Sequence, residues 1–144
     1  MAFERTYQVE SDHIDVQGIM DGLYYPFYFE RCRHDFLREV LGYDLESLAQ
    51  QGTNVVLSQY FIRFLRSIRK DDIIVVGCDA CPDTLNESVF HLKQEMRRAK
   101  KLVSTALFTA TFVQSSGGRS FIPQDLLTKL SEKPAITVPV LLME

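Results

Sequence analysis

Hydrophobic and polar positions follow two periodicities along the chain, one typical of a helix and one typical of strands. From Tyr24 to Leu41, apolar side chains recur every three or four residues, which predicts a long amphipathic helix. Pro26 suits its first turn and Gly42 its end. A shorter helix is expected from Asp44 to Gln51. The predicted core-facing stripe of the long helix is Tyr25, Phe29, Cys32, Phe36 and Val40, and its charged solvent face is Glu30, Arg31, Arg33, His34, Arg38 and Glu39.

The pattern typical of strands covers most of the remaining chain. A first strand is expected over residues 3–11, and runs rich in branched and aromatic residues predict strands at 54–66, 72–81, 88–97 and 102–114. The run at 88–97 alternates, which places His91 on a solvent-facing side, and the run at 102–114 is typical of a central strand. Short connections near 67–70, 83–87 and 98–101 predict an antiparallel meander.

One long helix with a broad aromatic face needs one large sheet to pack against. The order of elements therefore predicts an α+β fold in which a five-stranded antiparallel sheet wraps around the central helix. We expect one domain over residues 1–131, including a short helical segment after Pro123, and a C-terminal tail over 132–144. That tail is apolar with two prolines, and it is either ordered at a subunit interface or loose.

Composition narrows the class of protein. The 144 residues are 46% hydrophobic and 24% charged, as in an ordinary globular domain. A formal charge of −3 provides no overall positive field for nucleic acid, and no apolar run reaches the length of about 18 residues that spans a membrane. Together with the lack of a leader pattern, the odd number of cysteines predicts a cytoplasmic protein without a disulfide framework.

Cys78 and Cys81 form a C-x-x-C pattern inside a predicted strand. Residues three apart on a strand point to opposite faces, so this pair cannot chelate one metal ion and is interpreted as two packing thiols. The sequence contains no metal-ligand cluster, phosphate-binding glycine loop or flavin motif. We therefore expect neither a metal nor a cofactor.

The segment DVQGIMDGLYY, from Asp15 to Tyr25, resembles the D-x-x-G-x-x-x-x-x-x-Y motif of hot-dog-fold acyl-CoA thioesterases, and those of the 4-hydroxybenzoyl-CoA thioesterase type most of all. The motif leads directly into the long helix, as it does in that family. The stretches GTNVVLSQYFIRFLRSIRKDD and KKLVSTALFTATFV resemble later strands of the family, so the resemblance covers residues 4–130. It implies a hot-dog fold and hydrolysis of an acyl-CoA thioester to free acid and CoA.

The resemblance also implies site residues. Asp15 would act either as the nucleophile on the thioester carbonyl or as the general base that activates water, although it could also be an ordinary turn aspartate. The N–H near Gly22, at the start of the helix, would donate to the developing oxyanion, with a plain turn glycine as the alternative. Tyr25 would pack beside the site and orient it. Gly18 is assigned to chain geometry alone.

Part of the family carries a histidine or an aromatic residue where this chain has Asp21 or Gly22. Asp21 could therefore share acid and base roles with Asp15 and contact the substrate, or it could merely cap the helix. His13, His34 and His91 are all interpreted as surface residues.

Basic side chains near two turns are candidates to hold the phosphates of CoA. They are Arg97, Arg98, Lys100 and Lys101 at one turn, Arg63, Arg66, Arg69 and Lys70 at another, and Arg119. The acyl group is expected along the apolar side of the helix and against Val55, Val56 and Tyr60, in a tunnel closed by a second subunit. A homodimer or homotetramer is therefore expected, with acyl carrier protein as an alternative carrier of the acyl group. Competing functions are a non-catalytic acyl-CoA or acyl-carrier-protein binding module and an acyl-thioester hydratase or dehydratase.

Overall fold

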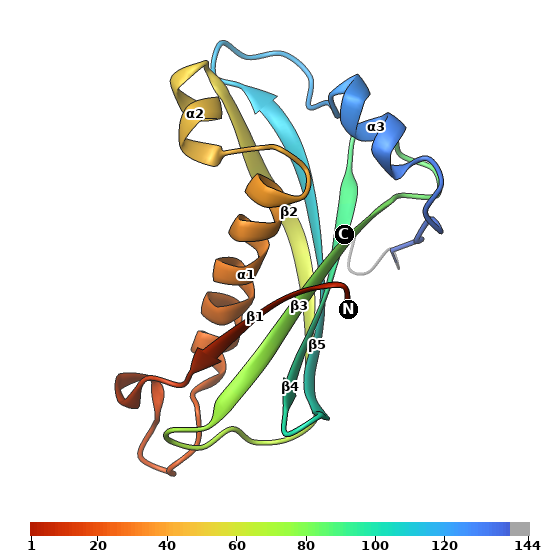
Figure 1. Ribbon diagram of the computed structural model, residues 1–144. Helices are drawn as coiled ribbons and strands as arrows, with labels where there is room; N and C mark the ends of the chain where they lie inside the picture. The colour runs from red at the N-terminus through yellow and green to blue at the C-terminus, as the bar shows by residue number, and fades with distance from the viewer. Residues whose placement is uncertain (139–144) are drawn as a thin grey trace, which may run out of the picture.

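The computed structural model describes residues 1–138, in which one antiparallel sheet packs against a long helix (Figure 1). The strands are β1 (Phe3–Gln8), β2 (Thr53–Phe64), β3 (Ile73–Pro82), β4 (Phe90–Arg98) and β5 (Lys101–Gln114). The α-helices are α1 (Tyr25–Glu39), α2 (Leu45–Gln50) and α3 (Gln124–Leu130), and the short 3₁₀ turns η1 (Ser11–His13) and η2 (Gly22–Tyr24) precede α1. This architecture confirms the predicted α+β hot-dog fold.

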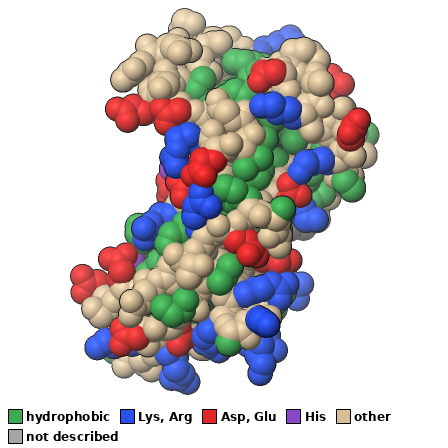
Figure 2. Space-filling model, in the orientation of Figure 1, with side chains coloured by type: hydrophobic (Ala, Val, Ile, Leu, Met, Phe, Trp, Pro, Cys, Tyr) green, Lys and Arg blue, Asp and Glu red, His purple; other side chains and the backbone are tan. Residues whose placement is uncertain are grey.

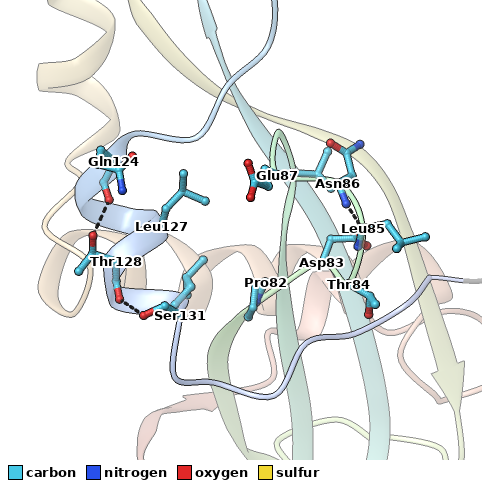
Figure 3. A pocket seen from close by; sticks show the side chains of 12 residues that line it. Pro82, Asp83, Thr84, Leu85, Asn86, Glu87, Gln124, Leu127, Thr128 and Ser131 are labelled. Carbon is cyan, nitrogen blue, oxygen red and sulfur yellow. Dashed lines mark hydrogen bonds between the residues drawn. The ribbon is translucent and has the colours of Figure 1, made fainter.

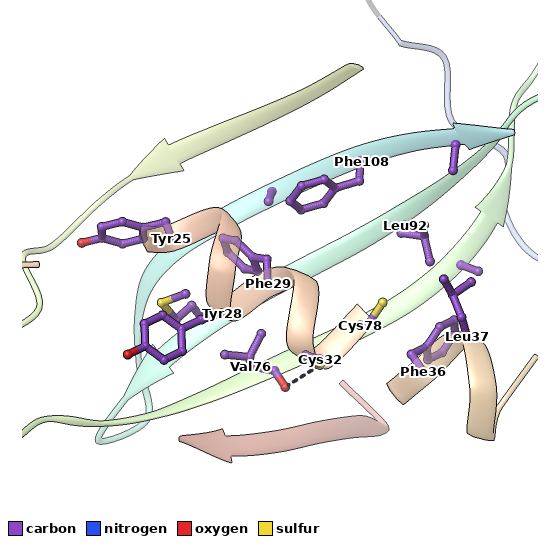
Figure 4. Close-up of a cluster of buried hydrophobic side chains, with 14 of the residues drawn as sticks. Tyr25, Tyr28, Phe29, Cys32, Phe36, Leu37, Val76, Cys78, Leu92 and Phe108 are labelled. Carbon is purple, nitrogen blue, oxygen red and sulfur yellow. Dashed lines mark hydrogen bonds between the residues drawn. The ribbon is translucent and has the colours of Figure 1, made fainter. Parts of the chain in front are cut away.

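The core lies between α1 and the face of the sheet that α1 covers, which we call the inner face. Phe29 is fully buried, and its ring centroid lies 5.9 Å from that of Phe108 on β5. The Cys32 thiol donates to the Val76 carbonyl at 3.2 Å, so even the polar atom of this side chain is satisfied (Figure 4). Each large apolar side chain buried here contributes roughly 1.5–3 kcal/mol. Cys32, Cys78 and Cys81 are all buried free thiols, which confirms their packing role.

Two residues, one in α1 and one just after it, correct the predicted helix faces. Val40 is 49% exposed, because α1 ends at Glu39 and the helical stripe is not continued; Leu41 is buried in its place. Arg33 is only 5% exposed, because it follows Phe29 by one helical turn and therefore flanks the buried stripe. The wide apolar stripe thus carries a cation along one side.

The strand order is β1-β3-β4-β5-β2, which corrects the predicted meander. β3, β4 and β5 follow one another as neighbours, but β2 pairs with β5 at the far edge. Residues 65–72 therefore cross below the ends of β5 and β4 before β3 begins. They are held there by the Leu65 N–H, which donates to Val103 O at 2.9 Å. β5 is an interior strand, as predicted.

The chain after β5 closes the opposite end of the sheet. Ile136 exchanges hydrogen bonds with the β3–β4 connection: its N–H donates to Pro82 O at 3.0 Å, and its carbonyl accepts from the Thr84 N–H at 3.0 Å. The first part of the predicted tail is thus attached to the domain, while residues 139–144 lie outside the described residues. No helix within residues 1–138 is long and apolar enough to cross a membrane.

Candidate active site

Asp15 lies at the tip of a small hairpin between η1 and η2. Ile14 and Met20 form an antiparallel bridge, and the Asp15 N–H donates to Ile19 O at 2.8 Å. Gly18 closes the turn with φ +83°, a left-handed conformation that favours glycine. The hairpin therefore gives Gly18 the geometric role that was predicted from the sequence.

The Asp15 carboxylate is oriented by the residue two positions later. The Gln17 N–H donates to Asp15 Oδ1 at 2.7 Å, whereas Oδ2 has only a long contact of 3.4 Å with the Gln17 side-chain amide. The side chain is half-buried. One carboxylate oxygen is thus fixed while the other retains capacity for a proton or a carbonyl carbon.

Asp21 caps the start of the helical segment and leaves one donor free. Its carboxylate accepts from the Leu23 N–H at 2.9 Å, and its carbonyl accepts from the Tyr24 N–H at 3.0 Å. The Gly22 N–H has no hydrogen-bond acceptor anywhere in residues 1–138. Because helix starts favour negative charge, this free N–H is a ready donor to an oxyanion. Asp21 therefore has the capping role that the sequence left open.

Gly22 and Tyr25 line a hollow of about 330 Å³ at the start of α1. The Tyr25 ring packs edge-on against Phe64, with centroids 4.8 Å apart, and burial raises the pKa of the Tyr25 hydroxyl. The Tyr25 side chain is thus a neutral wall of the hollow. Asp15 is not among its lining residues, whereas Phe64 and Arg66 are. Phe64 was missed from the sequence because nothing local shows that β2 ends beside the start of α1.

The crossing segment 65–72 joins this hollow to the Asp15 hairpin. The Met20 N–H donates to Ile68 O at 2.7 Å, and Ile19 forms an antiparallel bridge with Arg69. Ile68 is fully buried and anchors the segment. Two of the predicted basic positions, Arg66 and Arg69, are consequently placed beside the hairpin that carries Asp15.

The β4–β5 turn brings further cations to the same end. Arg98 forms an ion pair with Asp72 at 2.9 Å and donates to Ser67 O at 2.5 Å, which ties the turn to the crossing segment. Arg97 pairs with Glu95 at 3.1 Å, and Lys100 is exposed. Figure 2 shows Lys and Arg side chains gathered at this lower end of the molecule. Arg119, in contrast, follows β5 at the other end of the sheet.

The three residues predicted to contact the acyl group do not share one face. Val55 pairs with Phe112 and Tyr60 with Phe108, so both side chains lie on the inner face of β2. Val56 is turned to the outer face, because neighbouring residues of a strand alternate. The structure therefore separates Val56 from the predicted acyl-binding set.

Comparison with known protein families identifies the chain. The model of the thioesterase-like superfamily matches residues 9–130, which is nearly the whole domain. The chain belongs to the thioesterase-like superfamily.

Solved structures show the same fold for this thioesterase-like protein. A hypothetical protein from Aquifex aeolicus superposes with a TM-score of 0.76 at 25% identity, covering 89% of this chain and 98% of that one. A 1,4-dihydroxy-2-naphthoyl-CoA thioesterase from Synechocystis gives 0.78 at 16% identity, with coverages of 91% and 96%. A hypothetical protein from Staphylococcus aureus, solved in complex with CoA, gives 0.76 at 19% identity, with coverages of 96% and 89%. No curated protein gives a significant match.

Two histidines of the thioesterase-like protein are buried, against the prediction that all three lie at the surface. His13 is 9% exposed, stacks on Tyr24 with centroids 4.0 Å apart, and contacts the Tyr28 hydroxyl through Nδ1 at 2.8 Å. It holds the hairpin of Asp15 against α1. His91 is fully buried, and both of its side-chain partners come from other segments, the β3–β4 turn and the neighbouring strand β5. Its Nδ1 contacts Thr109 Oγ1 at 2.9 Å, and its Nε2 contacts Asp83 Oδ1 at 2.8 Å.

A larger hollow, with a volume of about 840 Å³, lies far from Asp15, between the β3–β4 connection and α3 (Figure 3). Several of its polar groups are already paired. The Asp83 carboxylate accepts from the N–H groups of Leu85 and Asn86, and the Thr128 hydroxyl donates to Gln124 O. Asp83 is thus engaged by its own loop and by His91, which gives it a structural role.

Replacing Asp83 should make the protein less stable at neutral pH and should weaken the loss of stability between neutral and acidic pH. Burial alone would raise the pKa of Asp83, but hydrogen bonds from His91 and from the loop N–H groups outweigh it, so the pKa lies below 3.8. A lowered carboxyl pKa stabilises the fold above pH 3.8 and loses this effect as pH falls through the folded value. Asp83→Asn should therefore lower Tm at pH 7, and the difference from wild type should shrink toward pH 3. Equal Tm values for wild type and Asp83→Asn at pH 7 would contradict this prediction. Asp12→Asn, which removes a carboxylate at an exposed position, is the control.

Proposed function

We propose that this protein hydrolyses acyl-CoA thioesters to a free acid and CoA, as an enzyme of the 4-hydroxybenzoyl-CoA thioesterase type. The observation that carries the proposal is that a half-free carboxylate on Asp15 and an unsatisfied N–H on Gly22 lie at the same end of α1, on the two sides of one short hairpin and cap. Thioester cleavage needs these two functions, an attacking or water-activating group and a donor to the oxyanion. Membership of the thioesterase-like superfamily supports the same reaction.

In the proposed mechanism, the thioester carbonyl oxygen points at the Gly22 N–H. Asp15 either attacks the carbonyl carbon or removes a proton from a water molecule that attacks it, and the CoA thiolate leaves. Asp21 acts indirectly, because its cap occupies the Leu23 and Tyr24 N–H groups and leaves that of Gly22 for substrate. Tyr25 shields the reacting carbonyl from water with its neutral, buried ring.

The phosphates of CoA are assigned to the basic side chains at the same end of the molecule. Arg97, Arg98 and Lys100 lie on the β4–β5 turn, which the Arg98 contacts fix beside the crossing segment. Lys100 is exposed and forms no ion pair within residues 1–138. The long guanidinium side chains suit phosphate oxygens. The Staphylococcus aureus neighbour bound to CoA supports CoA as the carrier for this fold.

A second copy of the chain is proposed to complete the acyl tunnel. Within residues 1–138, β2 pairs only with β5, and α1 packs over β1, β3 and β4. α2 also contacts β2, but three inner-facing side chains of β2 remain exposed, Leu57 at 42%, Tyr60 at 49% and Phe64 at 56%. Pairing β2 with its copy would satisfy this edge and cover the stripe. Antiparallel pairing would also bring Val55, at the start of one β2, toward the hollow at the end of the other.

Product analysis separates hydrolysis from the two competing functions. Acyl-CoAs, including an enoyl-CoA, are incubated with the purified protein and resolved by mass spectrometry. Hydrolysis yields free CoA and a free acid, whereas a hydratase yields one product that has gained water and kept its thioester. Appearance of the hydrated ester alone, or tight binding with no product, would overturn the proposal.

Gly22→Ala should lower activity without lowering stability. The backbone of Gly22 does not require glycine, and an added Cβ would meet only Phe64 Cζ, at 4.0 Å. Such a change reduces the entropy of the unfolded chain and stabilises by about 0.4–1 kcal/mol. Because the methyl group would project into the hollow, we expect kcat/KM to fall by about 10- to 100-fold through displacement of the thioester. Tm measures the change in stability, and kcat/KM measures the change in activity. An unchanged kcat/KM would count against the Gly22 N–H as the donor to the thioester carbonyl.

A further inference from the structure

Arg33 is a buried cation in the middle of α1. Its guanidinium lies 4.2 Å above the ring centroid of Phe108, and its Nη1 donates to Gln94 Oε1 at 3.2 Å. Gln94 is itself fixed, since its amide nitrogen donates to the carbonyls of Phe29 and Gly77 at 3.0 and 3.4 Å. Arg33 is thus held in one orientation by an aromatic ring and a neutral amide.

The Glu30 carboxylate, one helical turn before Arg33, acts on this charge only from beyond ion-pair distance. Among residues 1–138, every ion pair is formed by groups other than Arg33. A guanidinium has five N–H donors, and here one nitrogen has an acceptor. The Tyr7 hydroxyl is the sole buried side-chain atom of the described residues without a partner, so the other nitrogens of Arg33 keep contact with the surface. A buried charge usually has an opposite charge in contact with it, and among residues 1–138 no carboxylate makes that contact with Arg33, so its free N–H groups are available to an external anion.

The position of Arg33 relates it to the proposed site. It lies eight residues after Tyr25, which is about 12 Å along the helix axis. Phe108, on which it stacks, also contacts Tyr60 of β2, with ring centroids 5.2 Å apart. Arg33 therefore lies against the buried inner face of β5, next to the exposed side chain of Tyr60 on β2. The far end of an acyl group would lie along this part of β2 if its thioester were at Gly22.

We propose that Arg33 determines substrate specificity by binding a carboxylate at the far end of the acyl group. The inference rests on the proposed thioesterase function and adds a substrate class to it, acyl-CoAs that end in a carboxylate. The planar guanidinium suits a carboxylate because two parallel N–H groups can donate to its two oxygens. Stacking on Phe108 and the contact with Gln94 pre-orient it for this role.

The test compares two esters of equal chain length, suberyl-CoA and octanoyl-CoA, which differ in a terminal carboxylate against a terminal methyl group. Wild type should favour suberyl-CoA in kcat/KM by about 10- to 100-fold, because a charged hydrogen bond is among the stronger ones. Arg33→Met, which keeps length and removes charge, should bring the ratio of the two kcat/KM values to about one or below, and Arg33→Lys should restore part of it. No preference in wild type, or an unchanged ratio in Arg33→Met, would overturn the assignment.

Binding separates this inference from the proposed function. The affinities of the same two esters are measured on Asp15→Asn and on Asp15→Asn combined with Arg33→Met, with Tm confirming that both fold. A preference for suberyl-CoA that disappears in the double variant supports Arg33 even if no ester is hydrolysed, in which case only the proposed function fails. Equal affinities of the two esters for Asp15→Asn would overturn the role of Arg33 even if hydrolysis is observed.

Discussion

Asp15→Asn is expected to reduce kcat by about 10²- to 10⁴-fold, because an amide can neither attack a thioester nor take a proton from water. The fold should be unaffected, since the asparagine side-chain oxygen can still accept from the Gln17 N–H that now holds Oδ1 at 2.7 Å. KM should change little, because the carboxylate contributes to the reaction and not to the grip on CoA.

The control for this prediction is Asp12→Asn, which removes a charge from the adjacent η1 turn at an exposed position. Steady-state thiol release should be near wild type in the control and nearly absent in Asp15→Asn. If both variants kept wild-type kcat at unchanged Tm, the hairpin carboxylate would have no part in the reaction.

Leu57→Lys should convert a dimer into a monomer and lower kcat/KM by about 100-fold. Leu57 belongs to the open apolar stripe on the inner face of β2, where a lysine would have to be buried against the second copy. The activity should fall with the dimer, because the acyl group would lose one wall of its tunnel. Light scattering at micromolar concentration measures the first effect, and thiol release the second.

Gln59→Lys is the matched change on the same strand. Gln59 pairs with Thr109, which places it on the outer face, so the stripe remains intact. We expect this variant to stay dimeric and active. A wild-type protein that is monomeric and fully active would contradict the shared tunnel.

The elements of the fold were predictable because their signals are local. The stripe of Tyr25, Phe29, Cys32 and Phe36 repeats with the helical period, and the strands alternate or carry branched side chains. Strand order was not predictable from spacing, since the short segment 65–72 looks like a hairpin although it crosses to a distant strand. What decides this pairing is the set of contacts that β2 makes with β5, some fifty residues away in sequence.

The candidate site was likewise predictable only where its sequence signals are local. The distance along the chain from Asp15 to the helix start is local, and it placed Asp15, Gly22 and Tyr25 at one end of α1. The buried polar residues were misjudged because their partners are remote: His91 needs Thr109, and Arg33 needs Gln94, 61 residues on. Charge alone predicts exposure for such residues, and only the folded neighbours reverse it.

Single-turnover cleavage tests the central claim most directly. Wild type and Asp15→Asn, each in molar excess over one acyl-CoA, are mixed with the ester, and both bound ester and released CoA thiol are followed in time. We predict that wild type releases one CoA per ester, whereas Asp15→Asn binds the ester with similar affinity and leaves it intact. Equal release by both proteins, or binding without release by wild type, would contradict a thioesterase site built on Asp15.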